Sequence, residues 1–364
     1  MLIITVVSAL VTVLYLILVL HFIVGWEKTD TFVGGGDALS PVLISVIVPC
    51  KNEVRNISSL LLSLTEQSYC NYELILVNDH SDDATLEYIL SAQAKFSNIR
   101  VINAVGRGKK NALREGIQQS SGDLIVTTDA DCMHSKRWLQ TIAAFQSGYP
   151  SDLIICPVLF SKRNSLFSTL QRFEFASLVA SGAGAAGVGK PILCNGANLA
   201  FTKNAWQKNQ MHLHDEEQSG DDIFLLESVK KQGGIIRFLK SKDALAFVES
   251  AGSLKAFFKQ RRRWAAKSPS YTDWQIITTA CIVFGVSLWF VILIGLSFYN
   301  LQYCLALLLV FVIKYLIDTY FLYLISDFFQ LRRVCANSLA LSLVYPFYIV
   351  IVALIAFVVK PKQW

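Results

Sequence analysis

Apolar residues gather at the two ends of the chain, whereas the middle alternates short apolar runs with helical patterns. Residues 2–26 form one uncharged apolar run, and a helix needs about 20 such residues to cross a bilayer core. The run has neither a basic segment before it nor a small-residue cleavage site after it. We therefore interpret residues 1–26 as a retained transmembrane anchor rather than a cleaved signal peptide. Gly34, Gly35 and Gly36 then form a flexible link.

Three further apolar runs predict transmembrane segments within residues 274–359, at about 274–296, 304–325 and 339–359. The uncharged link 297–303 joins the first two into a hairpin. Basic clusters flank the runs: Arg261, Arg262, Arg263 and Lys267 come before the first, and Arg332 and Arg333 come before the third.

The positive-inside rule places both basic clusters, and the middle of the chain with them, on the cytoplasmic side of an inner or plasma membrane. Lys360 and Lys362 conflict with four full spans unless the last run re-enters without crossing. Within the second run, Lys314 and Asp318 share one helix face. They form either a mutually neutralising structural pair or part of a substrate path.

The middle of the chain, residues 41–252, has the pattern of an α/β domain. Apolar β-branched runs predict strands, and amphipathic stretches between them predict helices. The strands are expected at 44–49, 73–79, 99–103 and 123–128, and the helices at 56–67, 83–94 and 111–119. Strands separated by helices imply a mostly parallel sheet.

Polar residues follow three of these strands, where ligands bind in parallel sheets. Lys51, Asn52 and Glu53 follow the first strand, and Asp79 ends the second. Asp129 and Asp131 follow the fourth. Carboxylates are the ligands that Mg²⁺ prefers, together with substrate phosphates. The alternative for the aspartate pair is a solvated acidic turn.

Three later segments carry further candidates. Lys109 and Lys110, after a glycine loop, either reach a diphosphate or form an exposed basic loop. Of Asp221 and Asp222, one can cap the following helix and the other can act as a general base. Residues 253–268 form an amphipathic interfacial helix whose segment Gln260–Trp264 snorkels at the membrane, contacts a departing diphosphate, or does both, since Arg261 to Arg263 point in different directions.

Composition narrows the class of protein. The 364 residues are 53% hydrophobic and 16% charged, against about 25% charged in an average soluble domain. The net charge of +6 lies mostly beside the apolar runs, which suits a membrane surface and not nucleic acid. The eight cysteines lack zinc spacing, and we expect small buried side chains in a reducing compartment.

Six motifs in order resemble the membrane-bound members of glycosyltransferase family 2, the group of cellulose, chitin and hyaluronan synthases and ceramide glucosyltransferases. The resemblance covers residues 44–264. The matching segments are Ser45–Glu53, Val77–Asp83, Gly108–Arg114, Asp129–Asp131, Asp221–Asp222 and Gln260–Trp264. The sequence departs from the family at Asn78, often aspartate, at His80, commonly glycine, and at Arg114, often asparagine.

The resemblance implies a Rossmann-like GT-A domain. It also implies a metal-dependent hexosyltransferase or N-acetylhexosaminyltransferase that inverts the configuration at the anomeric carbon of the sugar. It implies that Asp131, with Asp129, binds Mg²⁺ or Mn²⁺. It implies that Asp222, beside Asp221, accepts the proton of the acceptor hydroxyl. It also implies that Asp79 contacts the nucleotide base of the donor. The implied donor site comprises Pro49, Glu53, Asp79, Lys109, Asp129, Gln260, Arg263 and Trp264.

Three functions follow as alternatives. The first is transfer of one sugar from a nucleotide-diphosphate sugar, expected to be a UDP-sugar, to a membrane lipid. The second is processive synthesis of a chitin-like or poly-N-acetylglucosamine polymer, with a saccharide acceptor. The third is a non-catalytic membrane scaffold. The small-residue run Ala180–Gly189 either lets an acceptor pass close to the backbone or forms a tight packing surface.

Overall fold

The computed structural model describes residues 2–34, 42–210 and 220–358. Gly35, Gly36, Lys360 and Lys362, on which two of the predictions above depend, lie outside these residues, as do residues 41 and 359 at the predicted boundaries. The chain folds into two compact units. The sheet unit comprises residues 29–161 and 193–249, and the helical unit comprises residues 2–28, 162–192 and 250–358.

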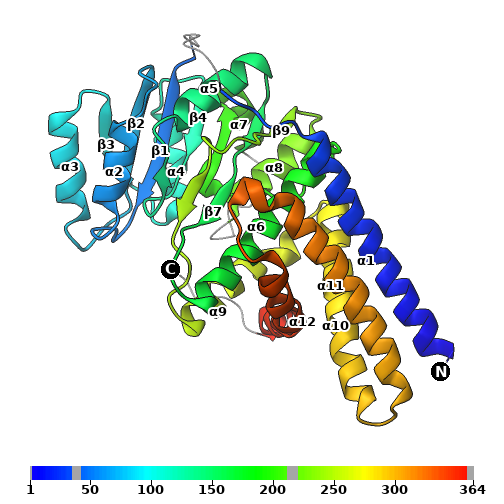
Figure 1. Ribbon diagram of the computed structural model, residues 1–364. Coiled ribbons are helices and arrows are strands. Elements are labelled where there is room, and N and C mark those ends of the chain that lie inside the picture. The colour runs from blue at the N-terminus through cyan, green and yellow to red at the C-terminus, as the bar shows by residue number, and fades with distance from the viewer. Residues whose placement is uncertain (1, 35–41, 211–219, 359–364) are drawn as a thin grey trace. The chain divides into compact units, whose positions relative to one another are not determined.

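The sheet unit is built on a seven-stranded sheet of order β3-β2-β1-β4-β8-β6-β9 (Figure 1). Its strands are β1 (Ile44–Cys50), β2 (Tyr72–Asn78), β3 (Ile99–Asn103), β4 (Leu124–Thr127), β6 (Leu153–Ile155), β8 (Leu199–Thr202) and β9 (Ile236–Phe238). All neighbouring strands run parallel except at β8, which is antiparallel to both β4 and β6. A smaller sheet joins β5 (Met133–His134), β10 (Ala246–Val248) and β7 (Val158–Phe160).

The sheet confirms the predicted α/β class with a mostly parallel sheet. The four predicted strands are present, with bounds that differ by one residue at most. Both neighbours of β1 are parallel to it, and its side chains are almost all buried, which explains why it appears as a continuous apolar run. Chain order reverses between β1 and β4, so the carboxyl ends of these strands form the switch point where open α/β sheets bind ligands.

Helices of the sheet unit connect these strands. They are α2 (Ile57–Thr65), α3 (Thr85–Lys95), α4 (Lys109–Gln118), α5 (Trp138–Gly148), α7 (Lys203–Asn209) and α8 (Asp221–Lys231), with a short 3-10 turn, η1, at Gly196–Asn198. Helix α4 packs closely on the sheet through Gly116. A Cβ there would lie 2.7 Å from Ile47 and 2.9 Å from Val77. The absence of a side chain therefore fixes the height of α4, which carries Lys109 and Lys110 at its first turn.

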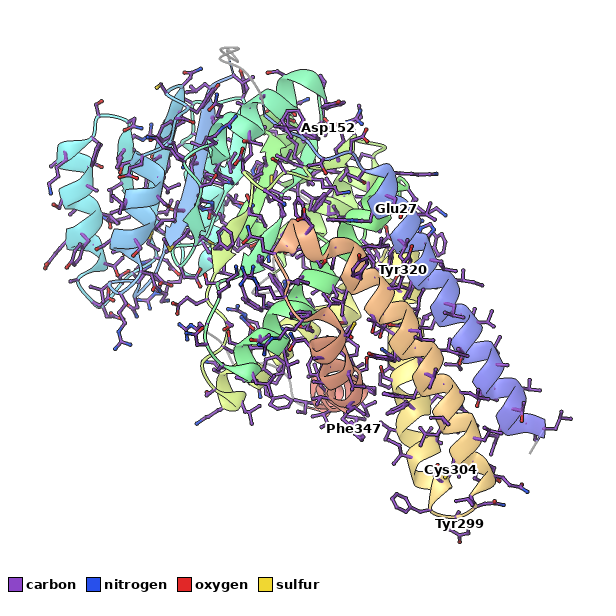
Figure 2. The ribbon with its side chains drawn as sticks, in the orientation of Figure 1. Glu27, Asp152, Tyr299, Cys304, Tyr320 and Phe347 are labelled. Carbon is purple, nitrogen blue, oxygen red and sulfur yellow. The ribbon has the colours of Figure 1, made fainter. Side chains whose placement is uncertain are left out.

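The helical unit contains four helices that are long and apolar enough to cross a membrane, within the part of the chain that the structure describes. They are α1 (Leu2–Lys28), α10 (Trp274–Ser297), α11 (Gln302–Phe329) and α12 (Val334–Val358). Helices α1, α10 and α11 lie side by side (Figure 1). Exposed Tyr299 and half-buried Cys304 mark the α10–α11 turn in Figure 2, and Tyr320 and Phe347 project from α11 and α12.

Two shorter helices complete the helical unit, α6 (Leu166–Gly187) and α9 (Leu254–Ala265), with a 3-10 turn, η3, at Ser268–Ser270. Residues 162–192 belong to this unit, although they fall inside the range 41–252 predicted for one domain. The reason is visible in the contact of α6 with α1. A Cβ on Gly25 would lie 1.7 Å from the Gly184 carbonyl oxygen, and one on Gly184 would lie 2.2 Å from the Phe22 carbonyl oxygen. The small-residue run is thus a helix-packing surface for α1.

Candidate active site

The loops that follow β1 and β2 are tied to each other by backbone-to-side-chain hydrogen bonds. The Asp82 N–H donates to Asn52 Oδ1 at 2.8 Å, and the Glu53 N–H donates to Thr85 Oγ1 at 2.8 Å. Asp83 accepts from the Val54 N–H at 3.2 Å. Asp83, in the segment matched to the family, therefore holds the loop that carries Glu53.

His80 and Asn52 both have left-handed backbone conformations, with φ of 53° and 57°. This conformation is unstrained for glycine and uncommon for other residues. It gives a physical reason why glycine is common at the position of His80. The His80 ring remains close to the site, since Nδ1 lies 3.3 Å from Asp79 Oδ1.

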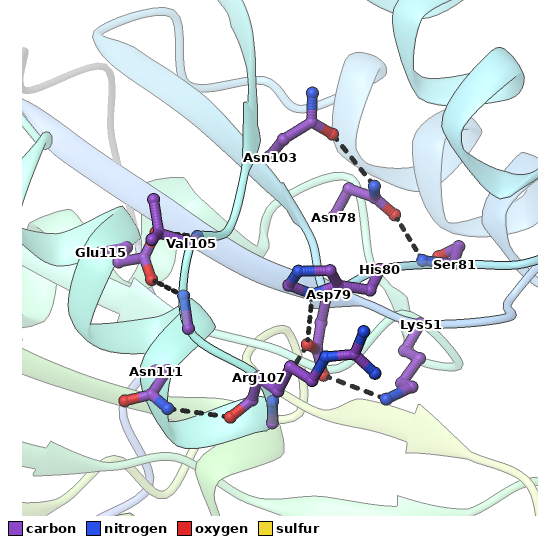
Figure 3. Close-up of polar contacts among 12 residues, drawn as sticks. Lys51, Asn78, Asp79, His80, Ser81, Asn103, Val105, Arg107, Asn111 and Glu115 are labelled. Carbon is purple, nitrogen blue, oxygen red and sulfur yellow. Dashed lines mark hydrogen bonds and ion pairs between the residues drawn. The ribbon is translucent and has the colours of Figure 1, made fainter.

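Asp79 is a buried carboxylate at the carboxyl end of β2, and Figure 3 shows the polar groups around it. The Gly108 N–H donates to Oδ1 at 2.9 Å, and Lys51 Nζ lies 3.7 Å from Oδ2. The preceding loop is shaped by α4. Glu115 accepts the N–H groups of Val105 and Gly106 at 2.8 and 2.9 Å. Gly108, with φ of 94°, then turns the chain into the helix.

Three consecutive residues, Gly108, Lys109 and Lys110, each reach a different carboxylate. The Gly108 N–H binds Asp79, and Lys109 forms an ion pair with Asp129. Lys110 Nζ lies 3.4 Å from Asp221 Oδ1, and both side chains are nearly buried. This segment at the start of α4 therefore brings together acidic residues that three separate stretches of sequence supply.

Asp131 differs from these carboxylates because no lysine or arginine lies within ion-pair distance of it among the described residues. The residue is exposed. Even so, the surrounding protein displaces water from its carboxylate, and Asp129 and Glu53 add negative charge, so that its pKa rises to about 6. Lys109 acts on this pKa in the opposite direction, but it contacts Asp129 and not Asp131.

This carboxylate pair fits a divalent cation in one particular way. No group of three or more His, Cys, Asp or Glu side chains that could hold a metal ion occurs in residues 2–34, 42–210 and 220–358. Mg²⁺ is usually bound by one or two carboxylates plus substrate phosphates. Asp131 and Asp129 match that ligand set, in which the substrate supplies the remaining oxygens.

Asp222 is held by two backbone N–H groups. The Gly196 N–H donates to Oδ2 at 3.0 Å, and the Ile223 N–H donates to Oδ1 at 2.9 Å. The residue at the N-cap position of α8 is Gly220, so neither aspartate occupies it. Burial raises the pKa of Asp221, and the adjacent Lys110 acts in the opposite direction. The two aspartates thus have different partners.

Asn198, which the sequence pattern did not single out, is a structural centre of this region. Asn198 is completely buried. It donates to the carbonyl groups of Pro157 and Ala244 at 2.7 and 2.8 Å and accepts from Trp138 Nε1 at 2.9 Å. The available signal was an asparagine directly before an apolar strand, and that signal alone does not distinguish a buried residue from a loop residue.

Two other predicted donor-site residues lie near the end of β1. Pro49 is the penultimate residue of that strand. The Glu53 carboxylate accepts from Asn56 Nδ2 at 2.8 Å, and burial raises its pKa. The departure at Asn78 has a structural partner, because its Nδ2 donates to Asn103 Oδ1 at 3.0 Å.

The helical unit contains the other three candidates, Gln260, Arg263 and Trp264, on α9. Arg263 is exposed, whereas its neighbour Arg261 is buried and forms an ion pair with Glu174 of α6. The Arg261 guanidinium lies 4.2 Å from the Trp264 ring centroid and 4.8 Å from that of Phe257. Tyr348 of α12 donates to Glu174 at 3.4 Å. Arg261 thus anchors α9, a role that the spacing alone did not assign.

The charges within α11 are confirmed as a mutual pair. Lys314 and Asp318 form an ion pair, and Tyr15 of α1 donates to Asp318 at 2.6 Å. The expectation that the cysteines are buried is only partly correct. Cys50, Cys132, Cys156 and Cys194 are buried, but Cys70, Cys281 and Cys335 are exposed. The last two lie on long apolar helices, where a small apolar side chain is compatible with lipid.

Known proteins are similar in sequence to parts of this chain. Residues 45–205 match the model of the family described as glycosyl transferase family 2. The chain is 33% identical to the glycosyltransferase AglE of Haloferax volcanii over 124 residues, 33% of this chain and 41% of the relative. It is 26% identical to a poly-β-1,6-N-acetyl-D-glucosamine synthase of Staphylococcus aureus over 226 residues, 61% of this chain and 53% of the relative. The chain thus spans about half or less of the length of these curated relatives.

A solved structure supports the fold. A mannosyltransferase from Pyrobaculum calidifontis, in complex with GDP-Man and Mn²⁺, superposes with a TM-score of 0.58 at 16% identity, covering 94% of this chain and 98% of that one. Such a likeness bears on architecture, and it confirms the predicted GT-A fold. The family match itself, within which the strand-end motifs occur in order, identifies residues 45–205 as a glycosyl transferase family 2 domain.

Proposed function

We propose that the protein is an inverting glycosyltransferase that moves a sugar from a nucleotide-diphosphate sugar, preferably a UDP-sugar, to a membrane lipid at the cytoplasmic face. The observation that carries this proposal is the segment Gly108–Lys110, which links the carboxylates of Asp79, Asp129 and Asp221. A donor needs groups for its base, its diphosphate and its sugar close together, and these residues supply them from one edge of the sheet.

The proposed roles follow from the surroundings of each residue. Asp79 binds the nucleotide base of the donor, and Lys109 with Asp129 orients its diphosphate. Asp131, assisted by Asp129, would hold Mg²⁺ or Mn²⁺, and such a cation neutralises charge on the leaving diphosphate. The relative bound to GDP-Man and Mn²⁺ supports a divalent cation. Pro49 and Glu53 contribute to the donor site, and Gln260, Arg263 and Trp264, in the helical unit, keep the roles that the family resemblance implies.

Asp222 is proposed as the general base. Its carboxylate accepts the proton of the acceptor hydroxyl while the hydroxyl oxygen attacks the anomeric carbon. The bond from that carbon to the diphosphate oxygen breaks, and the diphosphate leaves with the electron pair. One base and no covalent nucleophile give inversion. The two N–H groups that bind Asp222 use part of its acceptor capacity, and a carboxylate has about four acceptor positions.

The direct test is to incubate the purified protein in detergent with radiolabelled UDP- and GDP-sugars, membrane lipid and Mn²⁺. Label that enters the organic phase supports transfer to lipid. Asp222→Asn should abolish transfer and leave binding of UDP largely unchanged, because the substitution removes the base and keeps the size of the side chain. Retained turnover in Asp222→Asn would exclude this residue as the base.

Processive polysaccharide synthesis is the second candidate. It is favoured by the similarity to poly-β-1,6-N-acetyl-D-glucosamine synthases, which extends over 61% of this chain. The same incubation separates the two functions. A polymer stays at the origin of a chromatogram and is degraded by a matching glycosidase, whereas a glycolipid migrates with the organic phase.

The proposed orientation places the basic residues after α11 in the cytoplasm and the α10–α11 turn outside. Tyr299 is exposed at that turn and Arg332 lies after α11. In a variant without its native cysteines, a membrane-impermeant maleimide should label Tyr299→Cys in intact cells and should label Arg332→Cys only after the cells are opened. The reverse pattern would contradict the orientation.

A further inference from the structure

The turn at residues 195–198 lies between the strand β4 that leads to Asp129 and the proposed base Asp222. Its first helical residue, Gly196, donates its N–H to Asp222 Oδ2 at 3.0 Å. The Gly196 carbonyl group accepts from Thr127 Oγ1 at 2.8 Å, and Thr127 is the last residue of β4. One peptide segment thus contacts both the end of the strand and the base.

The turn is held in place by a buried polar network. Asn195 accepts from the Ala197 N–H at 3.0 Å and caps the turn. Asn198 makes three hydrogen bonds, to Pro157, Ala244 and Trp138, and it has no exposed surface. A buried amide with this many good partners specifies one backbone position strongly, because any displacement leaves a polar group unsatisfied.

The network continues to the loop that carries the proposed metal ligands. The Trp138 ring stacks on His134, with centroids 3.7 Å apart. His134 Nε2 lies 2.8 Å from Thr128 Oγ1, and Thr128 directly precedes Asp129. His134, Trp138 and Asn198 are all buried. The same side chains therefore set the position of the Asp129–Asp131 loop and of the turn that binds Asp222.

We propose that Asn198, Trp138 and the Gly196 N–H are positioning groups for the base Asp222. This proposal rests on the proposed function. It explains how the general base Asp222 is oriented. The Gly196 N–H restrains one carboxylate oxygen, and Asn198 and Trp138 restrain the turn. The network touches no reacting atom, so its removal should slow the chemical step and should leave donor binding intact.

Gly196 offers a test that removes one hydrogen. Gly196→Pro deletes the N–H that binds Asp222, and proline is tolerated at the first position of a helical turn. The preceding Asn195 has φ of −137° and ψ of 120°, which suits a residue before proline. Gly196→Ala is the matched control, because it keeps the N–H and a Cβ there would lie 3.6 Å from Asp222 Cβ, an ordinary contact.

The expected result is a split between turnover and binding. Gly196→Pro should lower kcat by about 10- to 100-fold, the size of effect that a small misplacement of a catalytic group produces. The donor KM and the binding of UDP should stay within about twofold of those of Gly196→Ala. Equal kcat for the two variants would overturn the proposal. So would a loss confined to KM.

The tryptophan offers a second matched pair. Trp138→Phe removes the N–H that binds Asn198 and should lower kcat. Trp206 is also buried, but its Nε1 has no hydrogen-bond partner within the described residues, so Trp206→Phe removes no such bond. Equal kcat for the two variants would count against the network. If kcat differs while the melting temperatures of the two variants fall by the same amount, a loss of stability does not explain the difference in kcat.

A double-mutant cycle in melting temperature makes the test independent of activity. Gly196→Pro and Asp222→Ala remove the two partners of one hydrogen bond, so their effects on the melting temperature should be non-additive. Additive effects would overturn the proposed contact. If the wild-type protein transfers no sugar and the cycle is still non-additive, the proposed function fails and the positioning contact stands.

Discussion

The carboxylates of the sheet unit and those of the helical unit differ in their ion-pair and hydrogen-bond partners. In the helical unit, Glu174 is paired with Arg261, and Asp318 is paired with Lys314. Each of these two carboxylates also accepts a hydrogen bond from a tyrosine hydroxyl, Tyr348 or Tyr15. Burial away from water is costly for a charge, and each of these two carboxylates has one cation and one hydroxyl group as partners.

In the sheet unit, the acidic residues at the carboxyl ends of the strands differ in whether a cation contacts them. Asp129 and Asp221 have lysine partners, but Asp131 has no cation within ion-pair distance among the described residues, although Asp129 and Glu53 lie near enough to raise its pKa. Asp131 is exposed and lies beside two further acids, as expected for the proposed ligand of a divalent cation. We infer that a carboxylate that lies beside further acids and has no cation within ion-pair distance is the proposed cation ligand, and the predictions below test this for Asp131.

The largest effect is expected from Asp131→Asn. Turnover should fall by about 10³-fold, since several kcal/mol of charge stabilisation at the diphosphate depend on the cation. The melting temperature of the metal-free protein should stay unchanged or rise, because the substitution removes an unneutralised charge. Initial rates over a Mn²⁺ titration and thermal melts in detergent measure the two quantities.

Asp152 provides the structural counterpart for this test. Its Oδ2 accepts the Ile235 N–H at 2.8 Å within the sheet unit, and Figure 2 marks its position. Asp152→Asn should lower the melting temperature and leave turnover near that of the wild type. If Asp131→Asn keeps its turnover, or if it behaves like Asp152→Asn, the distinction drawn from pairing is wrong.

The second effect concerns the paired carboxylate of the helical unit. Glu174→Gln leaves Arg261 buried without a counter-charge and should lower the free energy of unfolding by about 3–5 kcal/mol. Replacing both partners, as Glu174→Leu with Arg261→Met, should recover much of this loss, because two apolar side chains need no partner. Denaturant titrations in detergent measure the difference.

Glu27 is the control for this prediction, since its carboxylate is exposed in the same unit (Figure 2). Glu27→Gln should change the free energy of unfolding by no more than about 0.5 kcal/mol. A Glu174→Gln variant as stable as Glu27→Gln would show that the Arg261 pair contributes little to this unit.

The sequence predicted the elements in which local pattern and tertiary environment agree. Strands β1, β2 and β4 are buried parallel strands, and their continuous apolar runs carried the signal. The short strands β6 and β9 have three residues each, too few to show a period, and β8 pairs with β4 across a long stretch of chain. Pairing of this kind depends on contacts that periodicity does not encode.

The residues of the candidate site could be predicted where local sequence position was enough, but their contacts with distant residues could not. Asp79, Asp129, Asp131 and Asp222 could be predicted one by one, because each follows a strand or opens a helix. The contact of Lys110 with Asp221 and the network around Asn198 could not, since their partners are distant in sequence. The small-residue run of α6 was ambiguous for the same reason. Its partner, the segment of α1 around Gly25, had to be known first.

That packing surface gives the third prediction. Gly184→Ala places a Cβ 2.2 Å from the Phe22 carbonyl oxygen, so the two helices must move apart. The free energy of unfolding should fall by up to about 3 kcal/mol, the cost of inserting atoms into a packed interior. On α10, a Cβ added at Gly285 would have no atom within 4 Å, so Gly285→Ala should be neutral or slightly stabilising. Equal melting temperatures for the two variants would contradict tight packing of α1 on α6.

The smallest effect concerns pH and the buried His134 of the sheet unit. Burial lowers the pKa of His134 from 6.5 to about 3, and no charged group contributes to the shift. Between these two values the unfolded chain binds a proton that the folded chain does not, so stability is complete above pH 6.5 and falls as the pH decreases. At pH 5 the loss should be about 2 kcal/mol.

His134→Gln removes this proton and should flatten the dependence of stability between pH 7 and pH 5, at some cost in stability at neutral pH. The control is His80→Gln, which replaces a histidine whose side chain is about one third exposed. Thermal melts of the three proteins across this pH range separate the outcomes. If His134→Gln retains the full acid sensitivity, that sensitivity comes from the carboxylates. The unneutralised Asp131 would contribute with the opposite sign, because its raised pKa makes acid stabilising.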